Sequence, residues 1–372
     1  MFSISRFQQL MKALPRSDFE AMVREYAANK HDKKFSAWDQ MVAMVFGQLS
    51  GASSLRQIEA GFNVQASQHY HLRTGPVHRS TLADANNKRC VQVFARAVRH
   101  LMGQADRRLR AQVGQLLYVL DSTAITLKGQ GFDAWTLGPR TRHIQGLKLH
   151  VLYEANSQVP LMQGMSGANV NDIEWALDLP IEPGARYVFD KGYCDYNWWA
   201  HIEASGALFV TRFKRNAALI LEQERALQGE GAIVSDRLVR FAIKNGGGGR
   251  KNVYRKALRR IEVAREPGRG PLVLATNDLD SPAHEIAHYY RLRWQIELFF
   301  KWIKQNLQIK RFVGRSENAV RIQILCALIA YLLLALERKG SALKCSMRQL
   351  LAQLRSALFQ RPQSEAELAR RR

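Results

Sequence analysis

The chain has 372 residues and the composition of a folded protein, but an unusual charge. Hydrophobic residues make up 47% and charged residues 23%, which excludes an intrinsically disordered chain. The 55 Lys and Arg outnumber the 32 Asp and Glu, so the formal net charge at pH 7 is +23. A compact protein this basic repels itself unless a polyanion neutralises it, which favours nucleic acid or an anionic membrane surface as the partner.

The apolar pattern argues against a membrane. The longest apolar stretch, Ile324 to Leu336, has 13 residues, whereas a membrane-spanning helix needs about 20. We therefore expect a buried core helix there. The first 16 residues lack the apolar run of a signal peptide. The four cysteines show no paired spacing, which is typical of reduced thiols in an intracellular protein.

Residues 1–112 are predicted to be helical. Apolar residues recur at helical spacing over Phe35–Leu49, Ser53 and Ser54 precede a short helix that begins at Leu55, and a basic helix begins near Ser80. This order resembles a helix-turn-helix, although many small helical bundles share it. We expect an N-terminal DNA-binding domain over 1–112, without assigning the helix that reads DNA.

The pattern changes at about residue 113, where runs of β-branched and apolar residues begin. Three strands in succession, followed by a strand, a helix and a strand, predict a mixed α/β sheet. The helix carries Trp198 and Trp199, which we expect in the core. The expected strands are 116–127, 147–153, 159–165, 186–190 and 207–213.

Residues 214–270 interrupt this pattern with short alternating runs, which predict a β-rich insertion. The segment holds 14 Lys and Arg against 6 acidic residues. Its glycine run is not a phosphate-binding loop, because the required Gly-Lys-Ser/Thr does not follow. We expect Arg250, Lys251 and Arg255 to contact the DNA backbone; a solvated surface cluster is the alternative.

A last strand, 272–276, leads into a long helix that extends to Leu307. Ser281 suits the N-cap of this helix and Pro282 its first position. Four residues of the helix are separated by three, four and seven positions, so they fall on one face beside an apolar stripe. They are Tyr290, Arg293, Glu297 and Lys304, which we call the helix stripe.

The helix stripe has an ordinary interpretation as well as a catalytic one. Arg293 and Glu297 could be a surface ion pair worth about 0.3–0.5 kcal/mol. However, Asp121 lies inside an apolar strand and Asp190 ends another. A buried aspartate costs several kcal/mol unless it is paired or binds a metal. Two strand aspartates together with a helix glutamate suit the binding of a divalent cation. We call Asp121, Asp190 and Glu297 the acidic triad.

Carboxylates in this number point to phosphodiester chemistry. Two Mg²⁺ ions about 3.5–4 Å apart activate the attacking oxygen and stabilise the leaving one. Mg²⁺ is held by one or two carboxylates together with substrate phosphate. Cations one helical turn away would hold the phosphates in register.

The helix stripe, with its spacing, matches the signature of the insertion-sequence-four group of DDE transposases. Val119–Thr123 resembles the first acidic strand of that group, and Phe189–Tyr193 resembles the second. Leu274–Asn277 is similar to the strand ahead of the signature helix. Phe7 to about Asn63 resembles the domain of unknown function often found before the catalytic core. The resemblance covers most of the chain.

This resemblance implies a ribonuclease H-like catalytic domain over 113–340, a mixed sheet with flanking helices that contains the β-rich insertion, followed by a tail over 341–372. It implies that the acidic triad holds two Mg²⁺ ions, with Mn²⁺ as a substitute. It also implies that Tyr290, Arg293 and Lys304 contact phosphates at the transposon end, and Lys191 is a further candidate. The base-flipping tryptophan of the group does not carry over, which leaves Tyr254 or Phe241 as stacking candidates.

The function implied is an insertion-sequence transposase that binds terminal inverted repeats, cuts DNA and transfers strands. Its partners would be double-stranded DNA at the transposon ends and the target, and a second copy of the chain in a synaptic homodimer. A cytoplasmic, nucleoid-associated location in a bacterium follows. Two alternatives remain: a catalytically inactive DNA-binding repressor, and a ribonuclease H-fold nuclease without strand transfer.

Overall fold

The protein is described here by a computed structural model that covers residues 4–29, 34–136 without 111–115, 145–242 without 228–230, 251–340 and 345–362. The chain packs into two compact units. Unit 1 comprises Met1–Arg108, Ile125–Gly146 and Lys301–Arg372, and unit 2 comprises Leu109–Ala124 and Leu147–Phe300. The expected division into a DNA-binding domain (1–112), a catalytic domain (113–340) and a tail (341–372) stays a prediction.

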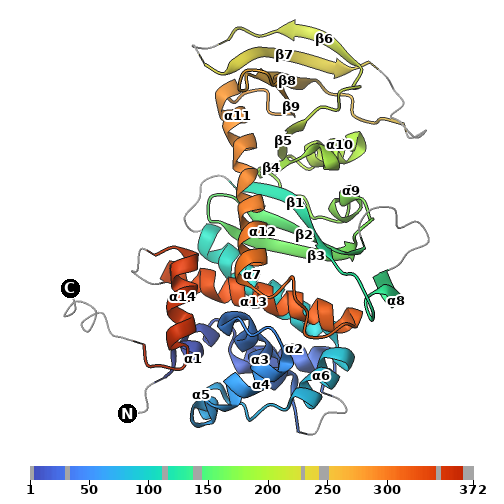
Figure 1. Cartoon of the computed structure of the whole chain (residues 1–372). Coiled ribbons are helices and arrows are strands. Elements are labelled where there is room, and N and C mark those ends of the chain that lie inside the picture. Colours follow the sequence, from blue (N-terminus) through green and yellow to red (C-terminus); the bar gives the residue numbers. More distant parts are fainter. Residues whose placement is uncertain are drawn as a thin grey trace, which may run out of the picture. The chain divides into compact units, whose positions relative to one another are not determined.

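Unit 1 is built of helices with clear capping signals (Figure 1). Ser36 and Asp39 form a capping box at the start of α3, and Ser54 caps α4 as expected. The expected basic helix is split in two, because the backbone of Arg89 is extended and its guanidinium binds the carbonyls of Ala28 and Phe35. The helices are α1 Arg6–Met11, α2 Arg16–Glu25, α3 Ala37–Ser50, α4 Leu55–Asn63, α5 His69–Leu72, α6 Arg79–Lys88, α7 Val91–Arg110, α8 Asp133–Thr136, α13 Glu317–Gly340 and α14 Met347–Ala357.

The most apolar helix, α13, is a core helix of unit 1. It is long and apolar enough to cross a membrane, yet 94% of its most apolar 18-residue window is buried inside the protein. It packs against α3 and α6. The burial confirms the expected core helix.

Unit 2 is organised around one nine-stranded sheet with the order β3-β2-β1-β4-β5-β9-β8-β7-β6. Strand β4 runs parallel to β1, and β5 runs parallel to β4. The sheet thus contains parallel and antiparallel pairs, as the mixed α/β sheet predicted from the sequence does. The strands are β1 Leu117–Thr126, β2 Gly146–Glu154, β3 Val159–Gly167, β4 Arg186–Phe189, β5 Leu208–Arg212, β6 Leu219–Glu224, β7 Ile233–Phe241, β8 Leu258–Val263 and β9 Leu272–Thr276.

The β-rich insertion is a continuation of this sheet. Strands β6, β7, β8 and β9 pair antiparallel in succession, and β9 pairs with β5 (Figure 1). The helices of unit 2 include α9 Asp172–Ala176 and α10 Tyr196–Ala204. Trp198 and Trp199 on α10 are buried in the aromatic core under the sheet, as expected.

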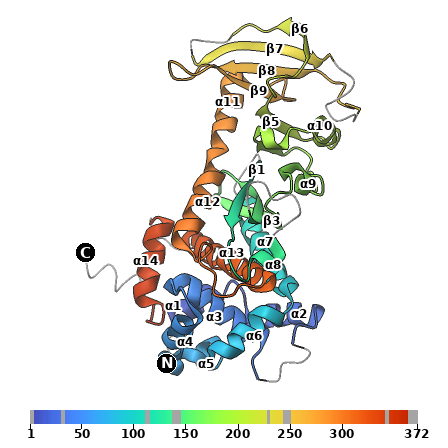
Figure 2. The ribbon, with the colours of Figure 1, turned by 45° about the vertical axis from the view of Figure 1, so that its right-hand side comes forward.

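The expected long helix is two helices that follow one another in nearly one line, α11 Ala283–Leu292 and α12 Trp294–Asn306 (Figure 2). The amide of Arg293 binds the carbonyl of Tyr290, three residues back, which tightens the junction. The prediction that Ser281 is the N-cap is wrong. The N-cap is Pro282, because the Ser281 hydroxyl is bound to Asp278 instead.

Candidate catalytic site

The two strand aspartates lie level with one another, Asp121 within β1 and Asp190 directly after the parallel strand β4. Leu120 of β1 pairs with Phe189, the last residue of β4, and Asp121 and Asp190 are the residues that follow this pair. Neighbouring strands lie about 4.8 Å apart. Backbone amides orient both carboxylates: Asp121 accepts from Ser122 at 2.8 Å, and Asp190 accepts from Gly192 at 2.5 Å.

The third acid reaches this point from α12. The Arg293 guanidinium binds Glu297 Oε1 at 2.5 Å and Asp121 Oδ2 at 3.4 Å, so it bridges the helix acid and the first strand acid. Asp190 and Glu297 both act electrostatically on Asp121. Only 18% of the Arg293 side chain is exposed. The interpretation of Arg293 and Glu297 as a simple surface pair therefore does not hold.

The electrostatics of this cluster favour added positive charge. Burial raises the pKa of Asp121 to about 6; the Ser122 amide and Arg293 oppose this rise, while Asp190 and Glu297 add to it. The donors are carboxylate oxygens, the ligands that hard divalent cations prefer. As placed, no three acidic, histidine or cysteine side chains in the described part of the chain lie close enough to hold one ion. The donor chemistry thus fits a divalent cation, while Arg293 takes the bridging place among the carboxylates.

A phenol and a second arginine border the acids. Burial raises the pKa of Tyr290, and the nearby Arg293 and Arg212 oppose that rise. Arg212 ends β5, which pairs with β4 in a register that sets it level with Asp190. Sequence reasoning missed Arg212, although its place at the end of an apolar strand repeats the pattern of Asp190.

The remaining DNA-binding candidates lie at several places. Lys191 is exposed in the turn directly after Asp190. Lys304 lies on α12 but belongs to unit 1. Lys251 and Arg255 are exposed in the segment before β8, and Arg250 falls outside the described residues.

The two stacking candidates belong to unit 2, where one is buried and the other is partly buried. Tyr254 is 2% exposed, and its hydroxyl donates to Glu203. Phe241 packs against Tyr254 and the aromatic core. Tyr254 is therefore not presented for stacking on a base and that expectation is wrong for it, whereas Phe241 is partly exposed and stays a prediction.

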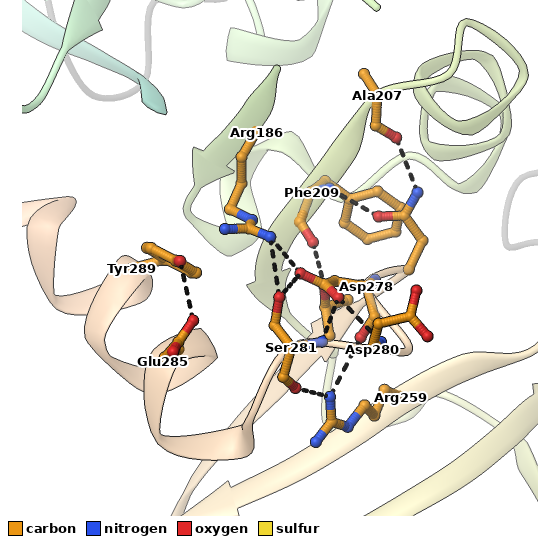
Figure 3. Close-up of polar contacts among 11 residues, drawn as sticks. Arg186, Ala207, Phe209, Arg259, Asp278, Asp280, Ser281, Glu285 and Tyr289 are labelled. Carbon is orange, nitrogen blue, oxygen red and sulfur yellow. Dashed lines mark hydrogen bonds and ion pairs between the residues drawn. The ribbon is translucent and has the colours of Figure 1, made fainter. Parts of the chain in front are cut away.

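A buried ion-pair network fixes the turn that leads into α11 (Figure 3). Asp278 binds Arg186 of β4 and accepts from the Ser281 hydroxyl at 2.6 Å. Arg259 of β8 donates to the Ser281 carbonyl and forms a bidentate pair with Asp236 of β7. All four charged side chains are at most 5% exposed.

The same network holds α11 against the sheet. The Arg186 guanidinium lies 4.0 Å from the ring centroid of Tyr289, the residue before Tyr290 (Figure 3). Arg186 begins the strand whose far end leads to Asp190. The network therefore sets the helix that carries Tyr290 and Arg293 against the strand that carries an acid of the triad.

Fold and site together define a class of protein, the mixed α/β proteins with one acidic residue on each of two neighbouring parallel strands and a third on a helix. A family model described as a transposase DDE domain matches residues 113–333, and a second, described as a domain of unknown function, matches residues 3–73. The chain belongs to the DDE transposase family.

Relatives carry the same description. The chain is 43% identical over 257 residues to "Putative transposase y4zB" of Sinorhizobium fredii, covering 68% of this chain and 69% of the relative. It is 27% identical to "Putative transposase for insertion sequence element IS4SA" of Synechocystis, covering 72% and 73%. Among solved structures, a piggyBac transposase in a synaptic complex with hairpin DNA aligns over 99% of this chain and 82% of its own, with 10% identity and a TM-score of 0.49. That likeness is too low to carry an argument.

Proposed function

We propose that this protein is a DNA transposase that binds the terminal inverted repeats of an insertion sequence, cuts there and joins the freed end to target DNA. The observation that supports this proposal best is the bridge of Arg293 between Glu297 of α12 and Asp121 of β1, with Asp190 next to Asp121 in the register of the neighbouring strand. The net charge of +23 suits a polyanionic partner.

The acidic triad would hold Mg²⁺, with Mn²⁺ as a substitute. These ions activate the attacking oxygen and stabilise the leaving oxygen of a phosphodiester. The backbone amides of Ser122 and Gly192 hold the carboxylates of Asp121 and Asp190 in fixed orientations. Pre-set ligands of this kind reduce the reorganisation that the reaction requires.

The cations around the triad would bind DNA phosphates. Arg293 can exchange a carboxylate for a phosphate oxygen, since its planar fork matches both. Tyr290 lies beside Arg293, whose guanidinium carbon is 5.9 Å from the centre of the phenol ring. Lys191 and Lys304 would add backbone contacts. Two copies of the chain would hold two transposon ends together, in the cytoplasm and at the nucleoid of a bacterium.

Incubation of the full chain with duplex DNA that carries the element's ends, a target plasmid and Mg²⁺ tests this proposal. We expect cleavage that exposes a 3′-hydroxyl, followed by joined products. Asp121→Asn and Glu297→Gln should each lower cleavage more than about 100-fold, as loss of a key electrostatic group does in other enzymes. The control is Glu266→Gln, which removes an acid whose side chain is 82% exposed. Full cleavage by either triad variant would contradict the assignment.

The two alternatives give different products in the same assay. An inactive repressor binds the ends specifically, with or without Mg²⁺, and cuts nothing. A nuclease of this fold cuts the ends but yields no joined products. Sequencing of the product junctions separates both from transposition.

A further inference from the structure

One carboxylate beside the acidic triad, that of Asp172, is bound through only one of its two oxygens. Asp172 begins α9, and its Oδ1 accepts from the Ser122 hydroxyl at 2.6 Å. The same oxygen lies 3.0 Å from Lys148 Nζ and 3.8 Å from His150 Nδ1. The other oxygen, Oδ2, makes no hydrogen bond with the described part of the chain. Asp172 is thus anchored through one oxygen only.

Asp172 Oδ2 and an acid of the triad lie close to the same point. The position that a Cβ of Gly192 would occupy lies 2.8 Å from Asp190 Oδ1 and 3.5 Å from Asp172 Oδ2. Both carboxylates therefore border the same small volume, which the missing side chain of Gly192 leaves open. Ser122 connects Asp172 to the other strand acid as well, because its amide binds Asp121 while its hydroxyl binds Asp172.

A second polar group at this place makes no hydrogen bond of proper geometry within the described part of the chain. Tyr193 is fully buried, and its hydroxyl lies near Ser122 without forming a hydrogen bond of proper geometry to any described residue. Asp172, Asp121 and Asp190 all act electrostatically on this phenol. Buried hydroxyls are nearly always hydrogen-bonded, so an unpaired hydroxyl in a fully buried side chain indicates a ligand or ordered water beside it.

We propose that Asp172 is a fourth acidic residue of the catalytic centre, and that its Oδ2 acts with Asp190 to hold a divalent cation there. The proposal rests on the proposed function, since it assigns a further residue to the same metal-dependent site. Lys148 and Ser122 fix Asp172 through Oδ1, as outer partners orient carboxylate ligands in metal sites. The hydroxyl of Tyr193 then finds its partner in the water that surrounds the cation.

A purely structural role makes a different prediction. If Asp172 only neutralised Lys148, its loss would change the stability of the fold and leave cation affinity unchanged. Asp172→Asn separates the two roles, because the amide oxygen still accepts from Ser122 and Lys148 while the negative charge is gone. Glu174→Gln is the matched control, since it removes the same charge from an exposed residue of the same helix.

The experiment is a titration of the full-length protein with Mn²⁺, followed by electron paramagnetic resonance of the free ion and repeated in DNA cleavage with Mg²⁺. We expect Asp172→Asn to bind Mn²⁺ at least about 10-fold more weakly. It should raise the Mg²⁺ concentration for half-maximal cleavage by a similar factor, with a smaller loss at saturating Mg²⁺. Glu174→Gln should match the wild type in both measurements.

Equal Mn²⁺ affinity of Asp172→Asn and the wild type, or equal weakening by Glu174→Gln, would overturn the proposal and leave the proposed function intact. Absence of Mn²⁺ binding by the wild type itself would instead contradict the metal site of the proposed function. Tyr193→Phe keeps the argument testable if Asp172→Asn does not fold. It should weaken Mn²⁺ binding without lowering the melting temperature of the metal-free protein, and unchanged Mn²⁺ binding would count against the proposal.

Discussion

The buried carboxylate of Asp278 offers the sharpest test of how unit 2 is held together. Its Oδ2 binds the Arg186 guanidinium and the Ser281 hydroxyl, and its Oδ1 accepts from the amides of Asp280 and Ser281 at 3.1 and 2.9 Å (Figure 3). Arg186 is 2% exposed and Asp278 is 3% exposed. Replacement of Asp278 by Asn keeps the size and an acceptor oxygen, but removes the negative charge that pairs with the buried Arg186 guanidinium.

The expected cost follows from that burial. Loss of one partner from a buried ion pair destabilises a protein by about 3–5 kcal/mol. We expect Asp278→Asn near the lower end, because the Asn oxygen still accepts the two amides. Asp278→Ala should lie near the upper end, since it also removes those hydrogen bonds. The exposed neighbour Asp280 is the control, and Asp280→Asn should cost less than about 0.5 kcal/mol.

Urea unfolding combined with hydrogen exchange measures these values. Exchange in peptides from β4, β8 and β9 reports on unit 2, and peptides from α13 serve as the internal reference in unit 1. Two results would refute this reasoning: a cost below about 1 kcal/mol for Asp278→Asn, or an equal loss of protection from exchange in α13. Either result would mean that Arg186 tolerates burial without its partner and that the network does not fix the turn.

The same carboxylate gives a pH dependence. Burial alone would raise the pKa of Asp278, but the hydrogen bonds from Ser281 and the charge of Arg186 outweigh it, so the pKa is lowered from its usual 3.8. A lowered pKa means that the stabilisation is complete above pH 3.8 and is lost as the pH falls through the folded-state value. The stability difference between the wild type and Asp278→Asn should therefore be constant from pH 5 to 8 and shrink below pH 3.8.

Three further predictions concern the acidic triad and the DNA. Burial raises the pKa of Asp121 to about 6, so its negative charge destabilises the metal-free fold by up to about 3 kcal/mol above that pH. Asp121→Asn should therefore raise the melting temperature at pH 8 but not at pH 3.5. A higher melting temperature at both pH values would contradict this cause. In Gly192→Ala the new Cβ would lie 2.8 Å from Asp190 Oδ1, and this displacement should lower the cleavage rate about 10- to 100-fold with DNA binding retained. Lys304→Met should reduce the slope of log K against log salt by about 0.9 in a filter-binding series, if Lys304 neutralises one phosphate.

Several features of this protein could be predicted from sequence because they depend on short-range pattern. The apolar runs outside the insertion predicted their strands to within a few residues. Helical spacing predicted α3, the serines before Leu55 predicted α4, and the longest apolar stretch predicted α13. The net charge of +23 favoured a polyanionic partner, and this inference needs no knowledge of the fold. The spacing of the helix stripe and the two strand aspartates, together with the family resemblance, singled out Asp121, Asp190 and Glu297 as the acids to examine.

Only the tertiary structure decided which groups surround those acids. Arg293 stands four residues from Glu297 in sequence, but its bridge to Asp121 spans 172 residues and depends on how α11 is fixed against β4. Asp172 and Arg212 reach the site because strand pairing and the turn at Gly192 set distant segments next to one another. Local propensity acts over one or two turns of the chain, whereas the partners of a buried charge are chosen by packing across the whole sheet.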